Sequence, residues 1–464
     1  MAIVAGVDSS TQSSKVELRE LETGRVVGTG SASHPVVTPP VSEQDPEAWW
    51  AAFEEAMAAA LAEAGVDSID AISVGAQQHG MVALDAGSVP VHPGKLWNDT
   101  ESADDANRLV AELGGAEAWA DAVGSVPVAA FTITKLAWLA RSHPDAWARV
   151  ARVLLPHDYL THRLTGRFAT DRGDASGTGY WSPSQGAYRF DLLELIDAER
   201  DWSQTVPDVL GPLDAAGDWN GAVVGAGTGD NMAAAMGVGL RPGDATISIG
   251  TSGTVYAVSP TPTADPSGAV AGFADATGRY LPLVCTSNAA KVVDAVRSLL
   301  GVDHAEFDRL ALAAEPGGPV LLPYFDGERT PNRPDSTGEL HGIRTDVTRE
   351  QFARAAVDGV ACGLLDGFDA LRQHCELGGR VLLVGGAARS DAVQRVIAGM
   401  TGTETVLADA DEAVATGAAV QAAAVLEQVD HSVIQERWGL GAGTSIDGVD
   451  CGDVRERYAA VRDR

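Results

Sequence analysis

The stretch that organises the chain lies near its middle and reads Val223-Val224-Gly225-Ala226-Gly227-Thr228-Gly229-Asp230-Asn231. A short apolar run breaks into alternating glycines and is followed by Met232 and three alanines, which is the pattern of a strand that ends where a helix begins. Asp230 stands at that junction, so we expect a carboxylate at the rim of a cleft. The plain alternative is that Asp230 only caps the helix, because an Asp there accepts hydrogen bonds from free backbone N–H groups.

A similar hairpin begins each half of the chain on either side of this stretch. Residues 3–8 and 14–19 are predicted strands joined by a turn rich in Ser and Thr. Residues 245–250 and 254–258 repeat that plan around Thr251-Ser252-Gly253. The repetition is one of pattern rather than identity, and it predicts two halves built on one plan. We expect the boundary near Leu240–Asp244, with domains that cover residues 1–241 and 242–464.

The remaining pattern supports alternating strands and helices. Asp45, Pro46 and Gly65 predict the start and end of a helix, and strand, strand, strand, helix, strand is the order of an actin-like unit. Gly417, among small residues, predicts close packing of a late helix. The expected fold class is therefore α/β, with two actin-like (ribonuclease-H-like) ATPase domains around a central cleft. Other expected strands are 26–27, 69–75, 81–84, 153–155, 222–227, 280–285 and 380–384, and other expected helices lie within 101–165 and at 289–300, 350–373 and 412–426.

Length and composition exclude several classes of protein. A chain of 464 residues is longer than one hydrophobic core usually holds, so more than one domain is expected. A content of 45% hydrophobic residues, with glycines scattered along the chain, indicates a globular protein. No apolar run is long enough to span a membrane, and the N-terminus runs straight into a strand, so we expect a cytoplasmic protein with no membrane partner. Four widely spaced cysteines are expected to be free thiols. A formal charge of −31 argues against nucleic acid as a partner.

The two hairpin turns are candidate phosphate cradles. Neither the Walker pattern nor the dinucleotide G-x-G-x-x-G pattern occurs. The turns at 8–14 and 250–253 instead offer backbone N–H groups and hydroxyls that can surround phosphate oxygens. Either turn alone is more typical of an ordinary hairpin, but their equivalent positions favour phosphate binding.

Three further positions complete a nucleotide and transfer site. Residues 385–390 resemble a strand-to-helix turn on which an adenine ring could lie flat, since glycine and alanine leave room; the alternative is a plain helix N-terminus. Asp8 suits Mg²⁺, as a ligand or next to one, because a hard cation prefers oxygen. Asp230 suits removal of a proton from an attacking hydroxyl.

The sequence resembles the FGGY family of carbohydrate kinases over nearly its whole length, from Gly6 to Ala419. The most specific match is the second family signature, which includes Gly338-Glu339-Leu340-His341-Gly342-Ile343 followed by Gln351-Phe352. The first signature fits around Thr132–Leu139 but departs at Ala130 and Ser142, and Ala387 stands where a third glycine is common. The other residues that carry the resemblance are 42–47 with Trp49-Trp50, Gln78-His79-Gly80, Trp97-Asn98-Asp99, Asp158-Tyr159-Leu160, Gly229-Asp230-Asn231, 247–253, 327–331 and 385–390.

The resemblance implies ATP-dependent, Mg²⁺-assisted phosphorylation of a primary hydroxyl on an open-chain ketose, D-xylulose at O5. It implies that Asp230 is the catalytic base and that Asp8 serves the metal and phosphates. The first domain would bind sugar and the second nucleotide. The other implied contacts are Gln78, His79, Trp97, Asp99 and Asn231 to the sugar, Ser10, Thr11 and Thr251 to phosphate, and Gly386, Ala387 and Ser390 to adenosine.

Alternatives remain open at this stage. The acceptor could be ribulose, gluconate or another polyol, although glycerol kinases of this family carry Arg-Glu where this chain has Gln78-His79. A non-catalytic actin-like sensor would not need both Asp8 and Asp230. His79 and Trp97 could instead be ordinary core residues. The expected partners are small molecules, with a homodimer left open as the assembly.

Overall fold

The computed structural model describes residues 2–464 and divides them into two compact units. Unit 1 comprises residues 2–239, Pro260–Leu281 and Glu412–Gly441. Unit 2 comprises Leu240–Ser259, Pro282–Asp411 and Ala442–Arg464. Both units are therefore discontinuous in sequence, and two segments that follow the expected boundary pack with the first unit.

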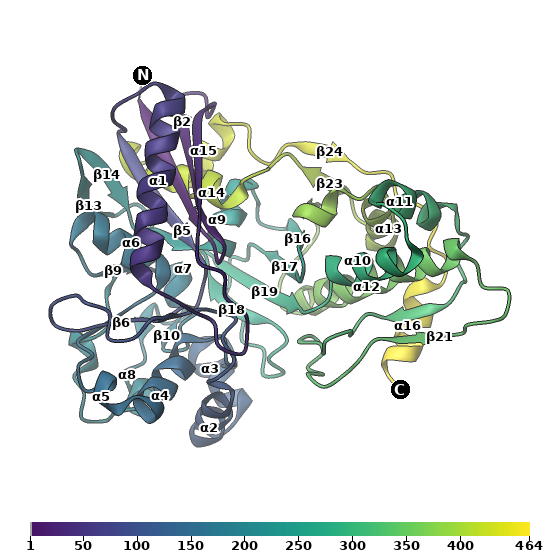
Figure 1. The fold of residues 1–464 in the computed structure, drawn as a ribbon, viewed down its shortest axis with the longest axis horizontal. Helices are drawn as coiled ribbons and strands as arrows, with labels where there is room; N and C mark the ends of the chain where they lie inside the picture. The colour runs from purple at the N-terminus through teal and green to yellow at the C-terminus, as the bar shows by residue number, and fades with distance from the viewer. Residues whose placement is uncertain (1) are drawn as a thin grey trace. The chain divides into compact units, whose positions relative to one another are not determined.

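The sheet of unit 1 begins with an antiparallel meander and continues with parallel strands (Figure 1). Its strand order is β13-β14-β5-β1-β2-β3. The strands β5 and β14 run parallel to each other, β1 runs parallel to β5, and β15 extends the pairing with β5. Their bounds are β1 Ile3–Ser9, β2 Ser13–Glu20, β3 Val26–Ser33, β5 Ala71–Ala76, β13 Ala215–Trp219, β14 Ala222–Gly225 and β15 Thr228–Gly229.

Six strands in the second sheet repeat this plan, in the order β19-β17-β16-β22-β23-β24. An antiparallel meander is again followed by two parallel strands and one antiparallel strand. The predicted duplication and the actin-like α/β class are confirmed. The bounds are β16 Ala245–Ile249, β17 Gly253–Ala257, β19 Tyr280–Thr286, β22 Val381–Val384, β23 Thr405–Ala408 and β24 Gly443–Ser445.

The helix α1, Pro46–Ala64, has the ends that the sequence predicts. Asp45 is its N-cap and accepts a hydrogen bond from the backbone N–H of Glu47, while Gly65 ends it in the left-handed conformation at φ +66°. Trp49 and Phe53 on its inner face are buried. Burial of this face fixes the helix against the sheet of unit 1, because apolar area is removed from water.

The helix α14, Ala413–Glu427, packs against the first sheet and against α9, Asp230–Gly237. A Cβ added at Gly417 would lie 1.8 Å from the Ala233 carbonyl oxygen, and one added at Gly6 would lie 1.8 Å from the Ala415 oxygen. The predicted close packing at Gly417 is confirmed. The helix that carries Asp230 is thus held by backbone-to-backbone contact that only glycine permits.

The remaining elements are the helices between the main strands of each sheet and several short strands. Among the elements that sequence patterns did not predict are β13, β18 (Ala271–Ala274), β23, β24, α11 (His304–Ala313), α15 (His431–Arg437) and α16 (Val454–Arg462). The remaining helices are α2 Ala103–Leu113, α3 Ala116–Val123, α4 Thr132–Ser142, α5 Pro144–Trp147, α6 Pro156–Thr165, α7 Arg172–Ala175, α8 Phe190–Leu193, α10 Ala290–Leu300, α11 His304–Ala313, α12 Arg349–Arg372, α13 Asp391–Thr401, α15 His431–Arg437 and α16 Val454–Arg462. Short strands include β6 Val82–Leu84, β8 Arg152–Leu154, β9 Ala169–Asp171 and β18 Ala271–Ala274.

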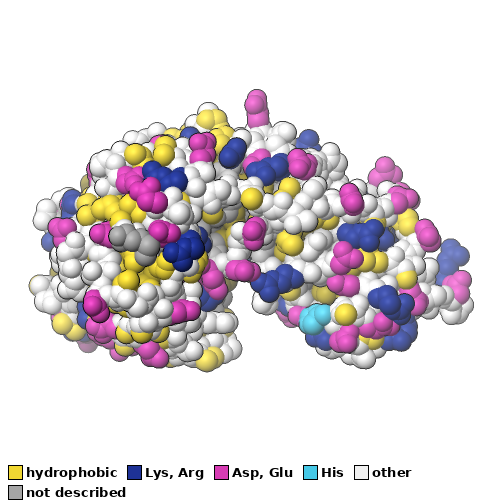
Figure 2. Space-filling view, turned by 90° about the horizontal axis from the view of Figure 1, so that it is seen from above, with side chains coloured by type: hydrophobic (Ala, Val, Ile, Leu, Met, Phe, Trp, Pro, Cys, Tyr) yellow, Lys and Arg dark blue, Asp and Glu magenta, His cyan; other side chains and the backbone are white. Residues whose placement is uncertain are grey.

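The surface carries acidic and basic side chains interspersed, and on the face drawn in Figure 2 the basic ones are not gathered into one patch. The four cysteines are free thiols, as predicted. Among residues 2–464, no helix is long and apolar enough to cross a membrane.

We predict that Gly417→Ala destabilises the protein by about 1–3 kcal/mol, because the new methyl group overlaps the α9 backbone. Gly363→Ala is the matched control, since Gly363 also lies within a helix but its nearest neighbour atom would be 3.7 Å from the new Cβ. That control is expected to stabilise by about 0.5–1 kcal/mol through helix propensity. Urea unfolding of both variants measures the difference, and equal effects would contradict the packing argument.

Candidate functional site

Three parallel strand ends meet at one edge of the first sheet. Asp8 on β1 and Thr228 on β15 are both in register with Gly75 on β5. Neighbouring strands lie about 4.8 Å apart, so the residues that follow these positions are brought together. Asp230, one residue beyond β15, is the first residue of α9. This edge therefore gathers the two carboxylates that the sequence singled out.

Asp230 is partly exposed and is not the helix cap. The N-cap of α9 is Gly229, and the Asp230 Oδ1 accepts from the backbone N–H of Asn231 at 2.8 Å and from its side-chain Nδ2 at 2.9 Å. Burial raises the pKa of Asp230 to about 6, while the hydrogen bonds from Asn231 work to lower it. A carboxylate with this pKa is better matched to proton removal near neutral pH than a solvated one.

Asp8 is buried, and its Oδ1 has no hydrogen-bond partner among the described residues. Burial and, to a smaller extent, the negative charge of Asp230 raise the pKa of Asp8 to about 7, while Lys15 works to lower it. Lys15 faces Asp8 across the hairpin but forms an ion pair with Glu412 at 2.6 Å. An unpartnered buried oxygen beside a second carboxyl group fits a bound cation.

Gln78 and Asn231 are hydrogen-bonded to each other at the sheet edge that carries Asp230. Asn231 Nδ2 donates to Gln78 Oε1 at 2.7 Å, and Gln78 Nε2 is buried without a hydrogen-bond partner in the described chain. The next residue, His79, has a φ of +66° and shares a hydrogen bond of 2.7 Å between its Nδ1 and the Gly177 carbonyl. Its ring stacks on Phe131 at 5.0 Å. These partners fix the His79 ring in one orientation.

The first hairpin turn connects to Trp97. The Trp97 Nε1–H donates to Thr11 Oγ1 at 3.0 Å, so the aromatic residue and the turn are held together. Ser10 Oγ donates to the Ser13 carbonyl at 3.1 Å, within the turn. The Gln44 side chain donates to the Thr11 carbonyl at 3.0 Å and so braces the turn from behind.

Asp99 has structural partners of its own. It is 1% exposed, and its Oδ2 accepts from the Ser42 backbone N–H and from Lys95 Nζ, each at 2.9 Å. Among residues 2–464, one group of acidic side chains converges closely enough to hold a metal, and it consists of Glu43, Asp99 and Glu101. The ammonium of Lys95 already bonds all three, at 2.9, 2.9 and 2.7 Å, so a cation is present without a metal.

The other candidates lie in unit 2. Thr251 is exposed in the turn between β16 and β17, and Gly386 and Ala387 begin a short 3-10 helix after β22. A Cβ at Gly386 would meet open space, which agrees with a surface available to a flat ring. The Ser390 hydroxyl caps α13 through the Val393 N–H and donates to Asp308 at 2.6 Å.

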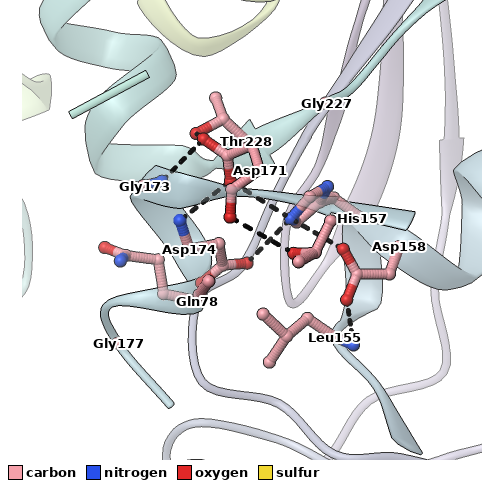
Figure 3. Close-up of polar contacts among 12 residues, drawn as sticks. Gln78, Leu155, His157, Asp158, Asp171, Gly173, Asp174, Gly177, Gly227 and Thr228 are labelled. Atoms are coloured by element: carbon pink, nitrogen blue, oxygen red, sulfur yellow. Dashed lines mark hydrogen bonds and ion pairs between the residues drawn. The ribbon is translucent and has the colours of Figure 1, made fainter. Parts of the chain in front are cut away.

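Sequence reasoning missed two sets of residues at these sites. Asp308, which also accepts from the Asp391 backbone N–H at 2.9 Å, braces the turn at Ser390. A buried group behind Asp230 was also missed, although Asp158 lies in a motif quoted for the family resemblance. Figure 3 shows its members: His157, Asp158, Asp171 and Asp174. Helix-cap spacing at 171–174 was the one signal in the sequence that could have indicated it.

Comparison with known proteins gives matches to both halves of the chain. A family model described as "FGGY family of carbohydrate kinases, N-terminal domain" matches residues 3–237, and its C-terminal counterpart matches residues 245–426. The xylulose kinase of Streptomyces coelicolor is 48% identical over 459 residues, which cover 97% of this chain and 93% of that protein. The xylulose kinase of Streptomyces rubiginosus is 46% identical over 461 residues, with coverage of 97% and 93%.

Solved structures give the same result. The crystal structure of xylulose kinase from Bifidobacterium adolescentis aligns with a TM-score of 0.87 and 40% identity, and the alignment covers 99% of each chain. The family matches cover the strands of both repeats except β24, and they include the strand edge that carries Asp8 and Asp230. The chain therefore belongs to the FGGY family of carbohydrate kinases.

Proposed function

We propose that the protein transfers the γ-phosphoryl group of ATP to O5 of D-xylulose, with Asp230 as the general base. The observation that carries the proposal is the strand edge at which Asp230, with a pKa raised to about 6, lies with Asp8, Gln78 and Asn231. Full-length relatives named xylulose kinase at 46–48% identity support the choice of sugar. Ribulose and gluconate as acceptors, and a sensor without turnover, are not favoured.

The proposed chemistry follows from the hydrogen-bond capacity of these residues. The free oxygen of the Asp230 carboxylate accepts the proton of the attacking hydroxyl as the new O–P bond forms and the bond to ADP breaks. Gln78 Nε2, which has no partner among the described residues, donates to a sugar hydroxyl, and Asn231 holds both Gln78 and Asp230 in place. His79 and Trp97 border the sugar.

The phosphates and metal are assigned to other groups. Mg²⁺ would be held by or next to Asp8, whose Oδ1 is buried and unpartnered within residues 2–464. When bound, the ion neutralises charge on the phosphate oxygens. Ser10, Thr11 and Thr251 would contact phosphate, while Gly386 and Ala387 would lie against adenosine. The Ser390 hydroxyl serves that turn through Asp308 and the α13 cap. Free ATP and sugar as substrates fit a cytoplasmic enzyme.

We expect ATP-dependent ADP release with D-xylulose, at a kcat/KM at least tenfold higher than with D-ribulose, gluconate or glycerol. Excess EDTA is expected to abolish the activity and added Mg²⁺ to restore it, because Lys15 is already paired with Glu412 and leaves the phosphate charge without a free lysine there. A coupled assay across the four acceptors measures both effects. A higher kcat/KM for another acceptor would overturn the sugar assignment, and full activity in EDTA would overturn the metal assignment.

Asp230→Asn is expected to lower kcat by about 10²–10⁴-fold, the usual contribution of a general base. The KM for D-xylulose should change less than threefold, since the amide is close to isosteric. Asp218→Asn, an exposed position on β13, is the control and should leave kcat unchanged. Steady-state kinetics on the folded variants decide the point: an Asp230→Asn enzyme with most of the native kcat would place the base elsewhere.

The rate should depend on pH in the direction set by the raised pKa values of Asp230, about 6, and Asp8, about 7. Both carboxyl groups must be ionised for the proposed roles, so kcat is fully developed at pH 8 and falls as the pH decreases to 5. Because the two groups interact, the acid limb reports the pair. Enzyme returned from pH 5 to pH 8 must regain its activity as a control. A kcat independent of pH between 5 and 8 would contradict the assignment.

A further inference from the structure

A single ring nitrogen is surrounded by three carboxyl groups (Figure 3), and the charge of the proposed base Asp230 acts on one of them, Asp174. His157 Nε2 lies 3.1 Å from Asp158 Oδ1, 3.4 Å from Asp174 Oδ2 and 3.6 Å from Asp171 Oδ1. All four side chains are buried. They come from the start of α6, the end of β9 and the short helix α7. We name these four residues the His157 cluster.

The 3.1 Å distance between His157 Nε2 and Asp158 requires a proton between them. An unprotonated imidazole nitrogen and an ionised carboxylate oxygen would present lone pairs to each other, which is repulsive in a dry interior. Burial lowers the pKa of His157 to about 3, so a neutral ring with one N–H is favoured. The Ala226 backbone hydrogen-bonds to the ring, and the ring nitrogen beside the neighbouring Gly227 is Nδ1, so Nδ1 carries that proton and the proton at Nε2 belongs to a carboxyl group. Burial raises the pKa of Asp158 well above its usual range.

The three carboxyl groups are not equivalent. Asp171 accepts hydrogen bonds from the backbone N–H groups of Gly173 and Asp174, each at 2.9 Å, and from Thr228 Oγ1 at 2.7 Å. Three donors stabilise its ionised form. Asp174 has the opposite environment: burial, followed by the charges of Asp158, Asp171 and Asp230, raises its pKa well above the usual range, and only a backbone hydrogen bond from His79 opposes this.

The other charged and titratable groups around the cluster do not supply a full countercharge. Burial raises the pKa of Asp171 to about 6, still below neutral pH, while its three hydrogen bonds and then Arg172 work to lower it. The Arg172 guanidinium also pairs with Asp275 at 3.4 Å. Tyr180 is buried nearby, and its pKa is raised by burial and by the charges of Asp158 and Asp174. Three ionised carboxylates at this position would therefore remain largely uncompensated, which disfavours that state.

Two contacts connect the cluster to substrate-facing residues. Thr228, which donates to Asp171, lies two residues before Asp230 and pairs with β5. The turn after α7 ends at Gly177, whose carbonyl shares the hydrogen bond with His79 Nδ1. A displacement of α7 would therefore move the supports of both Asp230 and His79.

We propose that the His157 cluster retains protons on Asp158 and Asp174 at neutral pH, and that His157 is a positioning residue for Asp230 and His79. The protonated Asp158 donates to His157 Nε2, and the ionised Asp171 holds Thr228 and the start of α7. The link to catalysis rests on the proposed function, whereas the protonation of the cluster does not depend on it.

Asp174→Asn tests the protonation directly, because asparagine is a neutral mimic of the acid form. A carboxyl group with a pKa raised in the folded state binds its proton more tightly there than in the unfolded chain. The protonated carboxyl group therefore stabilises the folded protein at low pH. This stabilisation is lost as the pH rises from the pKa of the unfolded chain, near 4, through the pKa of the folded protein. We expect the urea midpoint of the native protein to fall between pH 5 and pH 8 by more than that of Asp174→Asn.

Asp171→Asn is the matched variant, since the same substitution there removes an ionised acceptor of three hydrogen bonds. It is expected to lower kcat at least tenfold, while Asp174→Asn keeps at least half of the native kcat at pH 7. The same pH dependence of the urea midpoint in native and Asp174→Asn protein would overturn the protonation assignment. Native protein without kinase activity would instead show that the proposed function is wrong. The two failures are therefore distinguishable.

His157→Leu and His157→Gln test positioning. Leucine removes the acceptor for the Asp158 proton, and kcat should fall at least tenfold while the KM for ATP stays within twofold. Glutamine can accept that proton and should restore part of kcat. If His157→Leu does not fold, the comparison of native protein with Asp174→Asn still tests the protonation of the cluster. The kcat of Asp171→Asn then tests whether Asp171 holds Thr228 in place. A folded His157→Leu enzyme with native kcat would overturn the positioning role.

Discussion

Removal of carboxyl groups from water at one edge of the first sheet is the constraint on which the rest of the site depends. The parallel pairing of β1, β5 and β15 places Asp8 and Thr228 in register with Gly75, and Asp230 follows directly. Burial there raises the pKa values of Asp8 and Asp230, because a charged carboxylate is less well solvated in the protein than in water. The sheet geometry that stabilises the unit thus also brings the pKa of the proposed base closer to neutral pH.

The lysine that faces Asp8, and the buried lysine beside Asp99, are already neutralised. Lys15 pairs with Glu412, and Lys95 is enclosed by three acidic side chains. In a chain with a formal charge of −31, few cations remain to balance a triphosphate. This charge distribution is a physical reason why a divalent ion next to Asp8 is expected, and why the buried carboxyl groups of the His157 cluster are expected to retain protons.

Local sequence signals predicted the fold well where the conformation depends on the residue type at that position, as it does at the ends of helices. Asp45, Pro46 and Gly65 marked the ends of α1, and alternation in residues 14–19 marked the second strand of the first hairpin. The assignment of residues 412–441 to unit 1 was not predictable, because it depends on the contact of Gly417 with α9, far away in the chain. For the same reason, the sequence identified Asp230 by its position after a strand but gave no indication that Asp171, through Thr228, supports it.

In the proposed function, Asp230 meets the hydroxyl group that accepts the phosphoryl group. A crystal structure with D-xylulose, Mg²⁺ and a non-hydrolysable ATP analogue tests it most directly. We predict that O5 of the sugar lies within hydrogen-bond distance of an Asp230 carboxylate oxygen, about 2.6–3.2 Å, and faces the γ-phosphorus. An ordered sugar whose O5 contacts another side chain, with Asp230 beyond reach of any hydroxyl group near the γ-phosphate, would contradict it.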